Sequence, residues 1–155
     1  MIKRGPWTID DFESMSWHDV HVHGFRLDSF DPDLGASDLV MDIDFILEWK
    51  ESDGKFEFAV AQAVLRFHTV SDLKVTLDYA TPTAGMSPFS IAGIERETIE
   101  YRGGTGCFRW RIPINWPTGI IEFEAPGFTQ TLVGEIYVQS GQWLDAERRN
   151  AASSA

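Results

Sequence analysis

Alternation of apolar and polar residues with a period of two is the main pattern of this chain. In residues 39–49 the apolar positions are Met41, Ile43, Phe45, Leu47 and Trp49, and acidic residues stand between most of them. In residues 19–27, valine alternates with aspartate and histidine. Successive side chains of a strand point to opposite faces, so both segments are predicted to be strands with one buried face. Further strands are expected at Val64–His68, Leu73–Tyr79, Ile94–Tyr101, Cys107–Trp116, Gly119–Ala125 and Glu135–Gln139.

A first hairpin is predicted around Asp53-Gly54, because this dipeptide is the preferred centre of a type I′ turn. A turn at this position places Trp49 opposite Phe58 and Lys50 opposite Glu57. An aromatic pair then lies on one face of the hairpin and an ion pair on the other, which is the arrangement that a stable register requires.

A second hairpin is predicted around Pro117-Thr118-Gly119, where two alternating segments meet at a turn cluster. Pairing Ile112 with Phe123 places two apolar residues on one face. The same register places Arg111 opposite Glu124 on the polar face. Two hairpins between consecutive strands predict a largely meander topology.

A short helix is expected at Thr8–Ser16. Thr8 is a favourable N-cap, and Asp11 three residues later completes a capping box. The segment from Asp28 to Asp38 is predicted to be a loop, because it contains a proline, a glycine and several aspartates. A second short helix is expected from Ser140, passing through Trp143 and Leu144, and the tail from about residue 150 to 155 is expected to be frayed.

These elements predict one domain, residues 1–155, of the mainly β class. The expected architecture is an antiparallel meander sandwich or a strongly curved sheet of about eight strands, with the short N-terminal helix and a short C-terminal helix. A chain of 155 residues buries enough surface to fold without a disulfide or a metal. Its one cysteine, Cys107, cannot form a bridge within the chain.

The net charge narrows the classes of partner. Thirteen basic and 24 acidic residues give a formal charge of −11. Such a surface repels phosphate backbones and anionic lipids, so neither nucleic acid nor a membrane is an expected partner. A basic protein would be attracted, although acidity also serves solubility alone. No secretory signal or membrane-spanning stretch is evident, and the expected location is the cytoplasm.

Motifs of the common catalytic classes are absent from the sequence, so we expect a binding protein rather than an enzyme. There is no Walker-type phosphate loop, no GxSxG and no HExxH motif. The glycine-rich segment 103–106 lies between two expected strands, where it is typical of a hairpin turn and not of a phosphate site. The spacing of Asp31, Asp33 and Gly35 does not fit a calcium loop, and no resident cofactor is expected.

One polar cluster offers an alternative function. If the first two long strands are antiparallel neighbours with Val22 opposite Ile43, then His21 faces Asp44 and His23 faces Asp42. Two imidazoles and two carboxylates on adjacent strands are suitable ligands for a divalent metal such as zinc. The alternative function is therefore a domain that binds a metal or small ligand through this His/Asp face. An exposed face on which these residues pair weakly across strands explains the same pattern.

Two further sets of residues are candidates for binding a protein partner. The expected acidic loop carries Phe30 at its tip, and Phe30 serves either as an apolar anchor for a partner or as a cap on the core. In the second set, Trp17 and His18 are either a polar hot spot beside an aromatic anchor or a core tryptophan with its neighbour. The acidic residues of the loop are Asp28, Asp31, Asp33 and Asp38.

The segment Met15-Ser16-Trp17-His18-Asp19-Val20-His21-Val22, followed by Leu39-Val40-Met41-Asp42-Ile43-Asp44, resembles the opening of several small bacterial domains. Some of these are similar to immunity proteins of polymorphic toxin systems, in which an aromatic-His-Asp triplet introduces the first strand. The resemblance covers roughly the first third of the chain. It implies a protein-binding role, in which an acidic cytoplasmic protein blocks a basic toxin domain.

Overall fold

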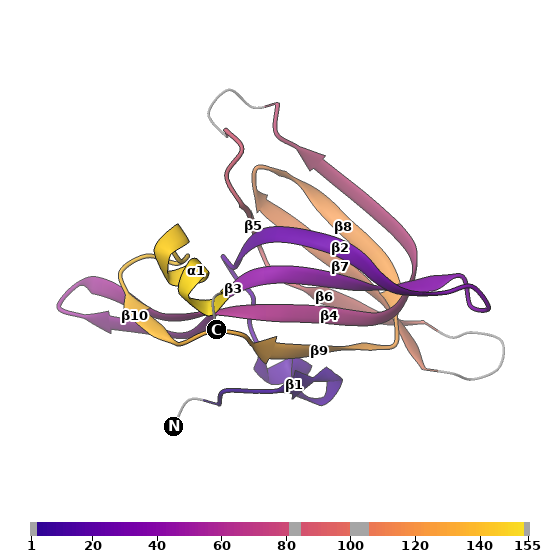
Figure 1. Cartoon of the computed structure of the whole chain (residues 1–155), viewed down its shortest axis with the longest axis horizontal. Helices are drawn as coiled ribbons and strands as arrows, with labels where there is room; N and C mark the ends of the chain where they lie inside the picture. The colour runs from indigo at the N-terminus through magenta and orange to yellow at the C-terminus, as the bar shows by residue number, and fades with distance from the viewer. Residues whose placement is uncertain (1–2, 81–84, 100–105, 154–155) are drawn as a thin grey trace.

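The computed structural model describes residues 3–80, 85–99 and 106–153. Within these ranges ten strands form one antiparallel sheet, so the predicted mainly β class is confirmed (Figure 1). The strands are β1 (Trp7–Thr8), β2 (His21–Asp31), β3 (Ala36–Ser52), β4 (Lys55–Asp78), β5 (Phe89–Ile91), β6 (Glu95–Ile99), β7 (Cys107–Trp116), β8 (Thr118–Ala125), β9 (Gly127–Leu132) and β10 (Tyr137–Gln139). The helices are the 3-10 helix η1 (Ile9–Ser14) and the α-helix α1 (Ala146–Ser153).

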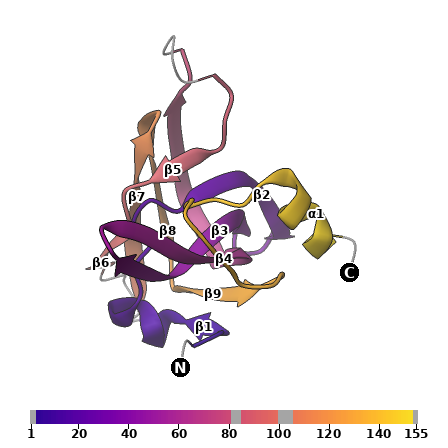
Figure 2. The same cartoon turned by 90° about the vertical axis from the view of Figure 1, so that its left-hand side faces the viewer.

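The strand pairings return to the strand from which they start. β4 pairs with β3, β3 with β2, β2 with β5, β5 with β7, β7 with β8, and β8 again with β4. In Figures 1 and 2, β2, β3 and β4 lie across from β7 and β8. The apolar core includes Trp17, Phe67, Trp110 and Phe123, whose side chains are almost completely buried.

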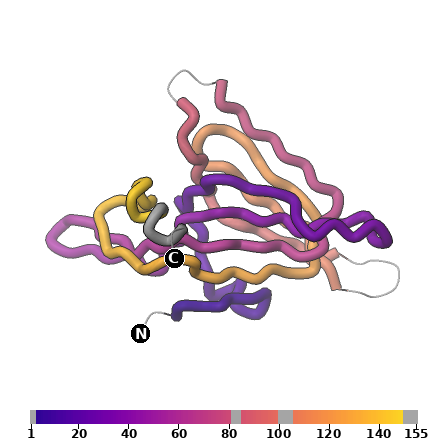
Figure 3. The backbone as a smooth tube through the Cα atoms, viewed as in Figure 1, coloured from indigo at the N-terminus to yellow at the C-terminus, as the bar shows by residue number. Residues whose placement is uncertain are grey.

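The register of the first predicted hairpin is confirmed, but Lys50 forms its ion pair with Glu48 of the same strand, over 3.8 Å, and not with the expected Glu57. Trp49 pairs with Phe58 and Lys50 with Glu57. Asp53 and Gly54 both have positive φ angles, of 53° and 74°, as a type I′ turn requires. The β3–β4 hairpin and the β2–β3 hairpin extend in opposite directions from the sheet (Figure 3).

The second predicted hairpin forms between β7 and β8, but its register differs from the prediction. Ile112 pairs with Ile121, and Arg111 pairs with Glu122, two residues earlier than expected. A shift of two residues preserves the face on which each side chain lies, so the alternation pattern cannot distinguish the two registers. In the observed register Gly119 pairs with Ile114, and it lies so close to β4 that a Cβ atom at this position would be 2.1 Å from the carbonyl oxygen of Thr76.

The predicted loop from Asp28 to Asp38 is wrong, because most of it belongs to the two strands. β2 continues to Asp31 and β3 begins at Ala36, which leaves a turn at residues 32–35. The strands predicted at Val64–His68 and Leu73–Tyr79 are parts of the single strand β4, which spans 24 residues. Three short or medium strands, β1, β5 and β9, were not predicted from the alternation.

The predicted N-terminal capping box is confirmed. The Thr8 N–H donates to Asp11 Oδ2 over 2.8 Å, and the Thr8 hydroxyl accepts from the Asp10 N–H over 3.4 Å. The C-terminal helix begins at Ala146, later than expected, and it ends at Ser153. In the described ranges, no helix is long and apolar enough to cross a membrane.

Candidate functional site

Three exposed apolar side chains gather at the far end of the β2–β3 hairpin. Leu27, Phe30 and Leu34 are 60%, 68% and 66% exposed. Phe30 therefore does not fold back to cap the core, and that interpretation of its role is wrong. We call these three residues, together with Asp31 and Asp33, the tip surface. Exposed apolar clusters of this kind are typical of binding sites.

The four aspartates of the predicted acidic loop have two different roles. Asp28 and Asp38 both accept hydrogen bonds from the Arg66 guanidinium, over 2.9 Å and 2.8 Å. The Arg66 contact lowers the pKa of Asp28. Burial raises the pKa of Asp38, but hydrogen bonds from the Thr69 N–H and from Arg66 outweigh it and the net pKa is lowered. These two carboxylates therefore share the single positive charge of Arg66 within the protein.

Asp31 and Asp33 remain as the acidic groups of the tip surface. Asp31 Oδ1 accepts the Asp33 N–H over 2.9 Å and the Leu34 N–H over 3.4 Å, which shapes the turn. Gly35 completes the turn with a φ of 64°. Among the described residues, neither Asp31 nor Asp33 has an ion-pair partner. The tip surface thus combines apolar side chains with uncompensated negative charge.

The His/Asp cluster is assembled, but its contacts differ from those expected. Val22 pairs with Ile43 and His21 with Asp44, as predicted. A register shift after Val22 then places Gly24, not His23, opposite Asp42. His23 instead donates through Nε2 to the carboxylate of the fully buried Asp44 over 2.8 Å.

An arginine from α1 occupies the space between the two carboxylates. The Arg149 guanidinium contacts Asp44 Oδ1 and lies 2.5 Å from Asp42 Oδ2. Asp44 also accepts the Leu144 N–H over 2.9 Å. Within residues 3–80, 85–99 and 106–153, no group of three or more His, Cys, Asp or Glu is placed to hold a metal ion. The carboxylates proposed as metal ligands are therefore bound to a cation that the chain itself supplies.

His21 lies apart from this network, against the C-terminal segment. Its ring stacks on that of Trp143 with 5.9 Å between the ring centroids. Burial lowers the pKa of His21, which keeps its ring neutral at physiological pH. The two histidines therefore do not converge on one position, as chelation of a metal would require.

Trp17 and His18 separate into a core residue and a surface residue. Trp17 is buried, and its Nε1–H donates to Gln130 over 2.8 Å. His18 is exposed, and its ring stacks on Trp49 with 6.0 Å between centroids. Asp19 accepts a hydrogen bond from Asn115 over 2.7 Å and so ties this segment to β7. The core interpretation of Trp17 is confirmed, and His18 remains accessible beside an aromatic ring.

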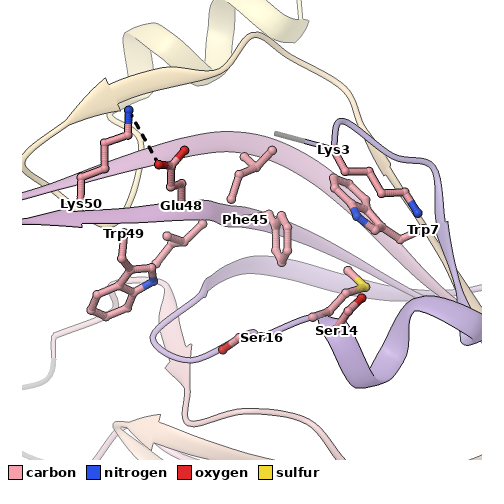
Figure 4. Close-up of a pocket in the computed structure, with 11 residues that line it drawn as sticks. Lys3, Trp7, Ser14, Ser16, Phe45, Glu48, Trp49 and Lys50 are labelled. Atoms are coloured by element: carbon pink, nitrogen blue, oxygen red, sulfur yellow. Dashed lines mark ion pairs between the residues drawn. The ribbon is translucent and has the colours of Figure 1, made fainter. Parts of the chain in front are cut away.

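A hollow lies between the N-terminal segment and the part of β3 that extends beyond β2 (Figure 4). It encloses about 850 Å³. Its charged groups are already paired, Lys3 with Asp11 and Glu48 with Lys50. The lining residues are Lys3, Trp7, Ser14, Met15, Ser16, Phe45, Ile46, Leu47, Glu48, Trp49 and Lys50. This lining contains no histidine or cysteine, and Glu48 is its one carboxylate.

Comparison with the known protein families gives no matching family model, and comparison with curated proteins gives no match. The resemblance to immunity proteins therefore stays a prediction.

Two residues that organise the site were missed by sequence reasoning. Arg66 lies in an alternating strand and is separated by 28 residues from Asp38. Arg149 is 105 residues from Asp44. The sequence shows that basic residues are scarce, but it contains no local signal for which acidic residues they neutralise.

Proposed function

We propose that this protein is a non-enzymatic binding domain that uses the tip surface to bind a basic protein. In the immunity-like form of this proposal, the partner is a toxin domain that the complex blocks. The observation that carries the proposal is the exposure of Phe30, Leu27 and Leu34 at the end of a hairpin that extends beyond the core. The scaffold is taken to be one strongly curved sheet, because its strand pairings form a closed circuit.

The energetics favour this use of the tip surface. Burying one large apolar side chain contributes about 1.5–3 kcal/mol, so three such residues supply the apolar anchor that charge alone does not. The net charge of −11 and the uncompensated Asp31 and Asp33 attract a basic surface over about 8–10 Å at physiological salt. Charge then speeds encounter, and the apolar residues prolong the complex.

The proposal is tested by affinity capture with the full chain, followed by quantitative mass spectrometry. The variants are Phe30→Ala and the double variant Asp31→Asn with Asp33→Asn. The matched control is Val138→Ala, because Val138 is 56% exposed on β10, away from the tip surface. We expect a protein of high isoelectric point to be retained by the unmodified chain and by the control.

Phe30→Ala should reduce that retention by about tenfold or more, which corresponds to the loss of one buried apolar group. Raising the salt from about 50 mM to about 500 mM should weaken capture by the unmodified chain more than capture by the double variant. Equal retention by all four proteins, or a captured partner that is acidic, would refute the proposal.

A further inference from the structure

We propose that the free edge of β2 receives an extended segment of the partner, which pairs with it as an additional strand. This inference rests on the proposed function and specifies how the partner is bound. It starts from the pairing of β2. β3 accompanies one edge of β2 from His21 to Asp31, whereas β5 pairs with the other edge only at His21 and Val22. From Gly24 to Asp31, no described strand occupies that outer edge.

An edge of this kind leaves backbone groups available for pairing. In an antiparallel strand, alternate residues direct both their N–H and C=O groups to the same edge. The regular part of this edge, from Gly24 to Asp28, rises about 17 Å at 3.4 Å per residue, which is the length of an ordinary strand, and it ends at an irregularity where Ser29 has a φ of 55°. Long free edges are usually protected by charge, by bulges or by a covering segment.

The side chains beside this edge indicate that a neighbouring strand is missing. Phe25 pairs with Met41 and Leu27 with Leu39, and cross-strand partners project on the same face. Met41 and Leu39 are buried, but Phe25 is 40% exposed and Leu27 is 60% exposed. Phe25 and Leu27 therefore lie on the core face of β2, where Phe25 contacts the ring of Phe89 at the end of β5, with 6.4 Å between centroids, and Leu27 lies beyond the part of β2 that pairs with β5.

The last part of β4, which borders the same groove as β2, also has apolar side chains that are incompletely buried. In the last part of β4, Val75 pairs with the buried Ile121, yet Val75 is 37% exposed. A groove of about 400 Å³ lies between the two walls, with Phe25 on one side and Leu77 and Tyr79 on the other. Two strands thus border one uncovered apolar strip, which an additional strand would cover.

The same sheet has a second free edge, on β6, and this edge is protected against pairing with another chain. The outer edge of β6 carries Glu95, Arg96 and Glu97 in succession. Charges at such density discourage pairing with another chain. The part of β2 with a free edge contains the charged residues Arg26 and Asp28. Both lie on the face opposite to Phe25 and Leu27, and Asp28 accepts a hydrogen bond from Arg66. The core face of the β2 edge therefore has no protecting charge of its own.

The expected occupant is a segment of the partner with apolar residues at alternate positions. That spacing matches Phe25 and Leu27, which are two residues apart on one face. Basic residues are expected where the segment reaches Asp31 and Asp33, the uncompensated carboxylates of the tip surface. A second copy of the chain fits less well, because each copy carries a charge of −11.

The test selects a binding peptide and then removes its backbone donors. The full chain is used to select from a phage-displayed library of random peptides, and an enriched peptide is synthesised with a fluorescent label. Two further versions carry N-methyl groups, one at the odd and one at the even positions. In a bound strand only one of these sets donates to β2, whereas both versions carry the same number of methyl groups.

We expect enriched sequences that alternate apolar residues with lysine, arginine or threonine. One methylated version should bind at least about tenfold more weakly in fluorescence polarisation, and the other should bind within about threefold of the parent. Leu27→Lys should abolish binding, whereas Val138→Lys should leave it unchanged. Hydrogen exchange measured by NMR should show that alternate amides of residues 24–28 become protected when the peptide is bound.

Three outcomes would overturn the inference. Equal loss or equal retention of binding with both methylated peptides excludes strand pairing. Failure to enrich any peptide that depends on Leu27 also counts against it. Dimerisation of the chain in sedimentation, with protection of the β2 amides, assigns the edge to a second copy. If capture of a basic protein still depends on Phe30 in these cases, the proposed function stands and only the binding mode is wrong.

Discussion

The two ends of the β2–β3 pair contain similar residues in opposite environments. At the end nearest the C-terminal helix, Asp44 is fully buried and bound by His23, Arg149 and the Leu144 N–H. At the tip surface, Asp33 is exposed, and Phe30 lies 68% exposed beside it. The difference comes from segments remote in sequence. The C-terminal segment covers one end of the pair, and no described segment covers the other.

Asp44→Ala should have the largest effect on stability. The substitution leaves the Arg149 guanidinium partly buried without one of its two carboxylates, and the Leu144 N–H without its acceptor. Removing one partner of a buried ion pair costs about 3–5 kcal/mol. The free energy of unfolding, measured by urea denaturation, should fall by that amount. Asp33→Ala is the matched control at the other end, where the change should stay within about 0.5 kcal/mol. Similar losses of unfolding free energy for both variants would contradict the difference in environment between the two ends of the β2–β3 pair.

Trp49→Ala examines the hairpin that extends in the opposite direction. Trp49 packs against Phe58 with 4.8 Å between the ring centroids, but it is 45% exposed. A fully buried tryptophan costs about 3–5 kcal/mol when truncated, so a half-exposed one should cost about 1.5–2.5 kcal/mol. Lys50→Ala, in the neighbouring cross-strand pair, should cost less than about 1 kcal/mol because its ion pair is exposed. Equal costs would indicate that the aromatic pair contributes no packing.

Asp38→Asn should reveal how the ion pairs with Arg66 depend on pH. The folded-state pKa of Asp38 lies below its ordinary value of 3.8. A carboxyl group with a lowered pKa stabilises the fold above the unfolded pKa, and this stabilisation is lost as the pH falls through the folded pKa. The substitution should cost about 0.5–1 kcal/mol at neutral pH, and this difference should shrink below pH 3.8. Urea denaturation at several pH values measures it, and a difference that grows on acidification would contradict the assignment.

Phe30→Ala should have the smallest effect on stability. An exposed side chain contributes little to the folded state, so the free energy of unfolding should change by less than about 0.5 kcal/mol. Binding of the basic partner should nevertheless weaken by about tenfold or more. A cost near 2 kcal/mol, roughly that of a buried phenylalanine, would show that Phe30 packs on the core in solution.

The sequence predicts local features of this fold well. The type I′ turn at Asp53-Gly54 and the capping box at Thr8 depend on neighbouring residues, and both are confirmed. The observed pairing of Val22 with Ile43 is the register on which the sequence analysis based the His/Asp cluster, one of several that match the apolar faces. Turn chemistry and alternation are local signals, and they suffice where the structure is itself local.

Sequence reasoning failed where remote charges decide the structure. The proline, glycine and aspartates of the segment from Asp28 to Asp38 predict a loop, and nothing in the segment indicates that Arg66 binds Asp28 and Asp38. The His/Asp cluster was a metal candidate for the same reason, since nothing local indicates that Arg149 lies between the two carboxylates. The free edge of β2 was also beyond prediction, because it depends on which strands pair across the whole chain.

The contact between Asp44 and Arg149 has a consequence for synthesis of the protein. The two residues are separated by 105 positions. At the usual rate of translation, roughly 5–20 s pass between the appearance of the aspartate and that of its arginine. During that interval the carboxylate has no guanidinium partner and must stay hydrated. The buried end of the β2–β3 pair can therefore be completed only after Arg149 has been synthesised, and docking of the helix that carries this arginine is expected to be a late step of folding.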